Sequence, residues 1–72
     1  MPLTTIHIPL LNEGTTVWRP AEAEQLSNGT FRILGPIPEG EEWAFVPGDT
    51  VVVKHHVFSD GTNGLIADRL AS

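Results

Sequence analysis

The chain has 72 residues, with no cysteine, no tyrosine and only four lysine or arginine residues. Without cysteine, neither a disulfide nor a thiolate zinc site can stabilise it. A chain this short buries only roughly 60–65% of the surface that its unfolded form exposes, so its core is small. With 40% hydrophobic residues it can still fold. We expect one domain spanning residues 1–72, and leave open whether it buries apolar surface against a second copy.

The shortage of basic residues leaves a formal net charge of −5. The four basic residues are scattered along the sequence and form no run: Arg19, Arg32, Lys54 and Arg69. Such a chain is repelled by a phosphate backbone and by an anionic membrane surface. The composition therefore argues against nucleic acid and membranes as partners.

Long apolar runs and catalytic motifs are also missing. No stretch approaches the ~20 apolar residues of a membrane-spanning helix. The first residues lack the basic start and apolar stretch of a signal peptide, so we expect a cytoplasmic location. The glycines form neither a Gly-x-Gly-x-x-Gly nor a Walker motif, and no serine lies in a Gly-x-Ser-x-Gly setting. We predict no enzymatic activity and no cofactor.

What the sequence does contain is alternation. Ile6 and Ile8 alternate with more polar residues, which predicts a half-buried strand over residues 4–10, with Pro9 at its edge or end. Residues 15–26 continue an extended pattern. The segment after Pro20 contains good helix formers, but it is short for a helix, so we favour a strand bent or bulged near Pro20.

Turn signals divide the rest of the chain. Asn28-Gly29 suits a type I′ hairpin that pairs residues 21–26 with a strand over residues 30–34. A proline-stiffened loop, a short apolar stretch and a Pro-Gly-Asp turn follow; they are residues 35–42, 43–46 and 47–49. Strands are predicted over 50–58 and 65–70, joined by a hairpin loop at 59–64. Five short strands with regular turns predict an all-β fold, a small five-stranded SH3-like barrel.

Several stretches also carry a resemblance to known proteins. Pro47-Gly48-Asp49 followed by Thr50-Val51-Val52-Val53 resembles the entry to a strand in SH3-like and KOW-like barrels. Four stretches are together similar to short uncharacterised bacterial proteins: Val17-Trp18-Arg19-Pro20, Ile33-Leu34-Gly35-Pro36, Glu42-Trp43-Ala44-Phe45 and Pro47-Gly48-Asp49. The resemblance implies a small barrel and assigns no activity. The chain departs from KOW-type RNA binders in its acidity, and from eukaryotic SH3 domains in lacking an acidic, tyrosine-rich stretch.

The histidines suggest an alternative function, a small-ligand or metal-binding accessory protein. His55 and His56 are adjacent on a predicted strand and point to opposite faces, so one metal cannot readily take both. His7 could join one of them across the sheet, with a carboxylate such as Asp68. The competing interpretation is a pair of solvated or hydrogen-bonded histidines at a strand end. The segment 60–64 lacks the ligand spacing of a calcium loop and is interpreted as a turn.

The aromatic residues give the main functional hypothesis. If Val17 faces inward, strand alternation turns Trp18 outward beside Arg19 and Pro20, a composition typical of an interface. If a bulge changes the parity, Trp18 belongs to the core. Trp43 has the same two alternatives, and the core is favoured for it.

An acidic loop adjoins Trp43 and contains Glu39, Glu41 and Glu42, to which Glu13 and Asp49 could add if the fold brings the loops together. Alone it is a solvated tip; beside a tryptophan it could recognise a basic partner segment. We predict a non-catalytic module that binds a protein partner or itself. The predicted partner-binding residues are Trp18, Arg19, Glu39, Glu41, Glu42 and Trp43. Binding could occur by pairing at the exposed strand 4–10 or through a symmetric dimer.

Overall fold

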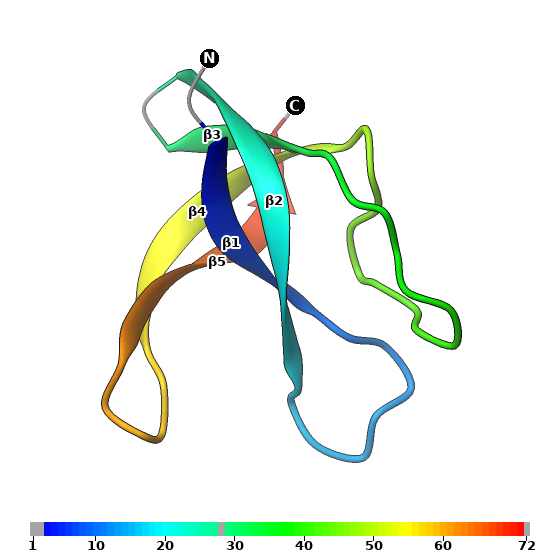
Figure 1. The fold of residues 1–72 in the computed structure, drawn as a ribbon. Coiled ribbons are helices and arrows are strands. Elements are labelled where there is room, and N and C mark those ends of the chain that lie inside the picture. Colours follow the sequence, from blue (N-terminus) through cyan, green and yellow to red (C-terminus); the bar gives the residue numbers. More distant parts are fainter. Residues whose placement is uncertain (1–2, 28, 72) are drawn as a thin grey trace.

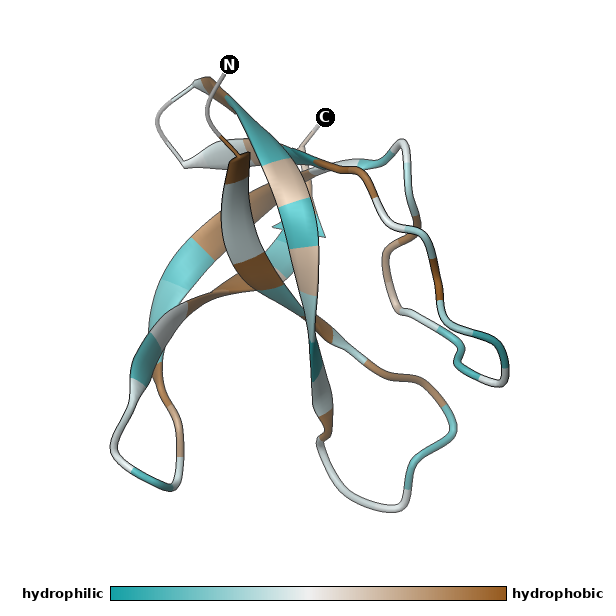
Figure 2. Cartoon of the chain, viewed as in Figure 1, coloured by the Kyte–Doolittle hydropathy of each residue, from teal (hydrophilic) through white to brown (hydrophobic). Residues whose placement is uncertain are grey.

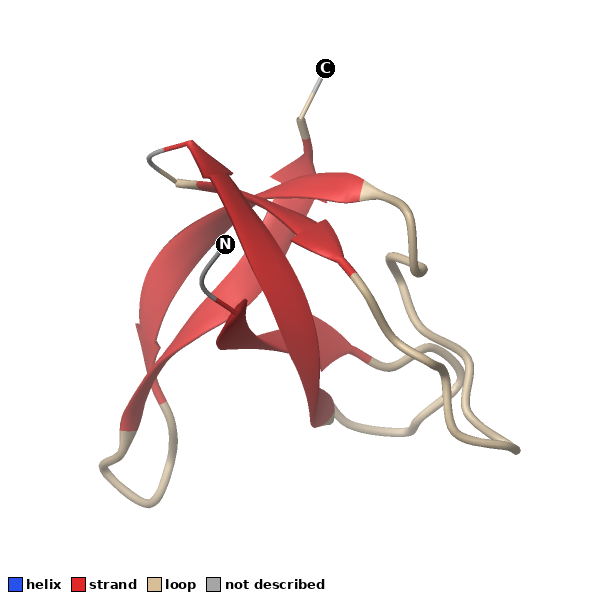
Figure 3. Cartoon of the chain, turned by 45° about the horizontal axis from the view of Figure 1, so that its top comes forward, coloured by secondary structure: helices blue, strands red, loops and turns tan. Residues whose placement is uncertain are grey.

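The computed structural model describes residues 3–27 and 29–71, and five β-strands make up its regular structure (Figure 1). Their bounds are β1 Leu3–Pro9, β2 Trp18–Ser27, β3 Thr30–Ile33, β4 Thr50–Val57 and β5 Asn63–Leu70. Successive strands pair antiparallel, and a parallel contact between β1 and β5 closes the barrel. The predicted all-β, five-stranded barrel is confirmed, and it is consistent with an SH3-like barrel (Figure 3).

Strand alternation produces the core. Ile6 and Ile8 on β1 are fully buried, while His7 between them faces the outside of the barrel. Along β2, Ala21 and Ala23 are buried and alternate with more exposed residues, and Figure 2 shows the corresponding bands of polar and apolar residues. Other strands and one loop complete the buried cluster with Phe31, Ile33, Trp43, Val51 and Ala67.

Residues 21–26 belong to β2, so the strand is confirmed over the helical alternative. β2 begins at Trp18 instead of at residue 15, because the residues before it form the connection from β1. The pairing of β2 with β3 shifts register between Gln25 and Ser27, and Gly29 follows with φ of 80°. Asn28, the other half of the predicted turn, lies outside the described residues.

The closed barrel bears on the exposed edge expected at residues 4–10. The strand at residues 4–10 was predicted to offer an exposed edge, but β1 pairs with β2 along its whole length and with β5 on its other side. The β5 contact is a single register pair, His7 with Ile66. Since β5 meets β1 at this one register pair, binding by strand addition at residues 4–10 stays a prediction.

A 16-residue connection, 34–49, joins β3 to β4 without a strand of its own. Trp43 holds it to the barrel: the residue is 4% exposed and forms an isolated bridge with Leu10. Backbone hydrogen bonds on either side reinforce this attachment, from Leu11 to the Glu42 carbonyl at 2.8 Å and from Ala44 to the Pro9 carbonyl at 2.9 Å. The core role favoured for Trp43 is therefore confirmed.

Membrane crossing by a helix can be checked against the described residues. Across residues 3–27 and 29–71, the chain has no helix with the length and apolar character needed to span a bilayer.

Candidate functional site

Four aromatic rings gather on the outer face of the barrel. Phe58 is central: its ring centroid lies 4.7 Å from that of His7, 4.8 Å from that of His56 and 6.3 Å from that of Trp18. Trp18 also lies 5.5 Å from His56. These are the separations of tilted and edge-to-face aromatic pairs, which attract one another beyond simple burial. All four residues are only partly buried, so the cluster is accessible from solvent.

The strand register brings these rings together. His7 pairs with Pro20 across β1 and β2, and Trp18 lies two residues before Pro20 on the same face. On the other hairpin His56 pairs with Gly64. Gly64 makes room for the rings, because a Cβ there would lie 2.9 Å from Cε2 of Phe58 and 3.1 Å from Cε1 of His7.

A groove of about 390 Å³ opens beside the cluster, and we call it the aromatic groove. Its volume is at the small end of the roughly 300–1,000 Å³ of ligand sites, which suits one or two side chains. The wall combines the rings with the polar β4–β5 turn. The lining residues are His7, Trp18, Pro20, Phe58, Ser59, Asp60 and Thr62.

Asp60 brings an oriented carboxylate to the groove. Its Oδ1 accepts hydrogen bonds from the Thr62 backbone N–H at 3.0 Å and from the Thr62 hydroxyl at 2.7 Å. These two bonds hold the pKa of Asp60 below its ordinary value of 3.8. The carboxylate is therefore ionised at neutral pH, and Thr62 fixes it through one oxygen. The segment 60–64 was predicted to be a turn in which Asp60 and Asn63 satisfy their own backbone; this is confirmed for Asp60, whereas Asn63 begins β5.

His7 is oriented as well. Its Nδ1 lies 3.2 Å from the carbonyl oxygen of Leu65. Because a carbonyl can only accept, Nδ1 donates this hydrogen bond, and the bond fixes the orientation of the ring. The groove thus combines ring faces with the oriented carboxylate of Asp60 and the oriented imidazole of His7.

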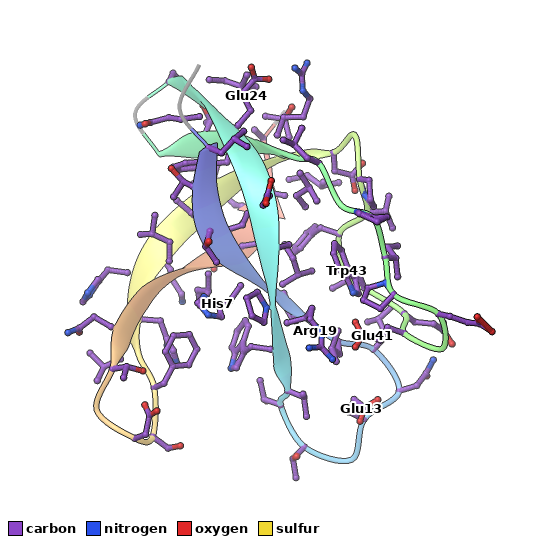
Figure 4. The ribbon with its side chains drawn as sticks, in the orientation of Figure 1. His7, Glu13, Arg19, Glu24, Glu41 and Trp43 are labelled. Carbon is purple, nitrogen blue, oxygen red and sulfur yellow. The ribbon has the colours of Figure 1, made fainter. Side chains whose placement is uncertain are left out.

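A second feature joins the long connection to the start of β2. Arg19 donates from Nε to Oε1 of Glu41 at 3.1 Å and from a terminal nitrogen to Oε2, and Trp43 Nε1 donates to Glu41 at 3.0 Å. Figure 4 shows Arg19 and Glu41 directed toward each other beside Trp43. The hydrogen bond from Arg19, then that from Trp43, lowers the pKa of the Glu41 carboxyl, and Glu41 raises the pKa of Arg19.

The structure divides the predicted partner-binding residues between these two features. Trp18 and Arg19 are adjacent on β2 and so lie on opposite faces, with Trp18 outside the core cluster and in the aromatic groove. Arg19 and Glu41 are paired with each other. Trp43 is buried, so its ring adds little contact surface.

The remaining acidic residues of the prediction do not form one patch. Glu42 accepts a hydrogen bond from Asn12 at 2.9 Å, and Glu39 is exposed at the tip of the connection. The Asp49 carboxylate accepts from the Val46 backbone N–H within its own turn at 3.0 Å. Glu13 is exposed on the loop after β1.

The histidine alternative is only partly reflected in the structure. His7 and His56 reach the same cluster through Phe58, while the exposed His55 is excluded from it. In residues 3–27 and 29–71, no three His, Asp or Glu side chains are arranged to hold a metal ion. Asp68 instead pairs with Lys54 and Arg69.

Sequence reasoning missed the grouping of Phe58, Asp60 and Pro20 with Trp18. The sequence did indicate that each of two residue pairs shares a strand face, because residues two apart on a strand point the same way. These pairs are Trp18 with Pro20, and His56 with Phe58 at the end of another strand. Placing the two pairs side by side needs the barrel register, which the sequence alone does not provide.

Comparison with protein-family models, curated proteins and solved structures found no match to this chain. The similarity to short bacterial proteins stays a prediction.

Proposed function

We propose that this chain is a non-catalytic protein-binding module that contacts its partner through the aromatic groove. The observation that carries the proposal is the group of four partly buried rings around Phe58 on the outside of the barrel. A small barrel gains most from aromatic rings placed inside, yet among the aromatic residues of the described ranges only Phe31 and Trp43 are buried. Tryptophan is among the residues that contribute most to protein interfaces.

Two further observations support this surface. The groove is lined by both ring faces and oriented polar groups, the mixture that gives a binding site affinity and specificity. Closure of the barrel gives β1 a neighbour on both sides, which favours contact through side chains over extension of the sheet.

Selection from a random peptide library displayed on phage, with the full chain as bait, tests the proposal. We expect enriched peptides whose binding Trp18→Ala abolishes. Leu26→Ala is the matched control, because it removes a large side chain, 44% exposed, from the opposite end of the same strand. It should leave binding unchanged.

Light scattering of the wild type and the Trp18→Ala variant at several concentrations shows whether the partner is a second copy. Loss of a dimer in this variant alone would identify self-association through the groove. If the selected peptides bind the wild type and a folded Trp18→Ala variant with equal affinity, the proposal is refuted.

A further inference from the structure

From the groove and the charge distribution around it, we infer that the aromatic groove binds an arginine side chain of the partner. This inference deepens the proposed function and rests on it. Aromatic faces attract a cation through their ring quadrupole, and a guanidinium also stacks flat on them. Trp18 and Phe58 supply such faces at the groove.

The carboxylate of Asp60 provides the charge partner. Both hydrogen bonds from Thr62 end on Oδ1, so in the described part of the chain Oδ2 has no hydrogen-bond donor. The oxygen belongs to a carboxylate that is already fixed in place. A guanidinium stacked on the rings could therefore donate to Oδ2 with little further ordering of the protein.

The protein's own basic residues do not fill this role. Within residues 3–27 and 29–71, each of the four lies beside a carboxylate other than Asp60: Arg19 with Glu41, Arg32 with Glu24, and Lys54 and Arg69 with Asp68. The net charge of −5 attracts a cationic partner as well. Charge complementarity thus favours a basic side chain over an acidic or neutral one.

Arginine suits the groove better than lysine. A guanidinium is planar, stacks on aromatic rings and presents several donors in one plane, whereas an ammonium is a compact and strongly hydrated charge. Asp60 keeps an acceptor at Oδ2, and the ring faces of Trp18 and Phe58 line the same groove. A planar group can stack on a ring and donate to the carboxylate at the same time.

The test is a nuclear magnetic resonance titration of the ¹⁵N-labelled chain with three capped pentapeptides. They share the flanking sequence Gly-Ser…Ser-Gly and carry arginine, lysine or citrulline at the centre. Citrulline keeps the shape of arginine without its charge. We expect shifts at Trp18 Nε1–H and at the Thr62 amide, with the arginine peptide binding about tenfold more tightly than the citrulline peptide. Added salt should weaken binding of the arginine peptide more than binding of the citrulline peptide.

Asp60→Asn makes the test specific. The asparagine carbonyl can still accept both hydrogen bonds from Thr62, so the turn is kept, while a donor replaces Oδ2. The variant should lower the affinity for the arginine peptide toward that for the citrulline peptide, leaving only the contribution of the rings to the preference. Glu39→Gln changes the net charge equally, on an exposed residue outside the groove, and should leave both affinities unchanged.

Equal affinities for the arginine and citrulline peptides, or no effect of Asp60→Asn, would overturn the inference. If the peptides nevertheless shift groove resonances, the proposed function stands and only the arginine preference falls. If none of the three peptides and no library-selected peptide perturbs the groove, both proposals are refuted.

Discussion

The two tryptophans should respond very differently to truncation, because one fills the core and the other lines a surface groove. Trp43 is 4% exposed and belongs to the buried cluster, while Trp18 is partly buried outside it. Truncating a buried tryptophan to alanine costs about 3–5 kcal/mol. A chain of this length has a total stability of roughly 4–11 kcal/mol, so Trp43→Ala should lose a large share of it.

The expected loss for Trp18→Ala is smaller. Its contacts are the tilted and edge-on pairs with His56 and Phe58, and such pairs contribute about 0.5–1.5 kcal/mol. The remaining three rings can keep their contacts with one another. With two such pairs lost, we expect Trp43→Ala to cost about 2 kcal/mol more than Trp18→Ala at the midpoints of these ranges.

Urea denaturation followed by far-ultraviolet circular dichroism measures both losses, since this signal does not depend on tryptophan fluorescence. Trp43→Phe, which keeps a ring in the core, should lie between the wild type and Trp43→Ala. Equal destabilisation by the two alanine variants, or a larger loss for Trp18→Ala, would refute the assignment of one tryptophan to the core and the other to the groove.

Two further substitutions test the groove and the Arg19–Glu41 pair. In Gly64→Ala the new Cβ would press on Phe58 and His7, so we expect a loss of stability of about 1–3 kcal/mol and weaker peptide binding. The control is Gly14→Ala, whose new Cβ would have no atom within 4 Å. This control should change neither stability nor binding. For Glu41, a lowered folded-state pKa means that its contribution to stability is present above its ordinary pKa of 4.5 and is lost as the pH falls through the lowered value. Glu41→Gln should therefore lower the melting temperature at neutral pH. On acidification, the melting temperature of this variant should fall less than that of the wild type. An unchanged acid profile in the variant would contradict the role of this pair.

Local patterns predicted the fold well. The alternation around Ile6 and Ile8, and the apolar run that contains Val51, placed two strands correctly, because burial of one strand face leaves a period of two in the sequence. The turn residues separated the strands. The start of β2 was misplaced, since residues 15–17 have an extended composition but serve the connection from β1.

The candidate site was predicted only in part. Trp18 was identified, but its neighbours come from three other segments whose registers depend on bulges and on barrel closure. The pairing of β4 with β5 shifts by one residue at Val52 and Val53, and such a shift changes which side chains face outward. Arg19 and Glu41 were both predicted to bind a partner, and the structure pairs them with each other.

Trp18, His56 and Phe58 form one cluster on the outside of the barrel. Nuclear Overhauser contacts between the aromatic protons of these side chains in the free protein test it most directly. We predict contacts from Phe58 to both His56 and Trp18, together with retained solvent access of the Trp18 indole. An indole in contact with Ile33 or Val51 of the core, and with neither ring, would contradict the account.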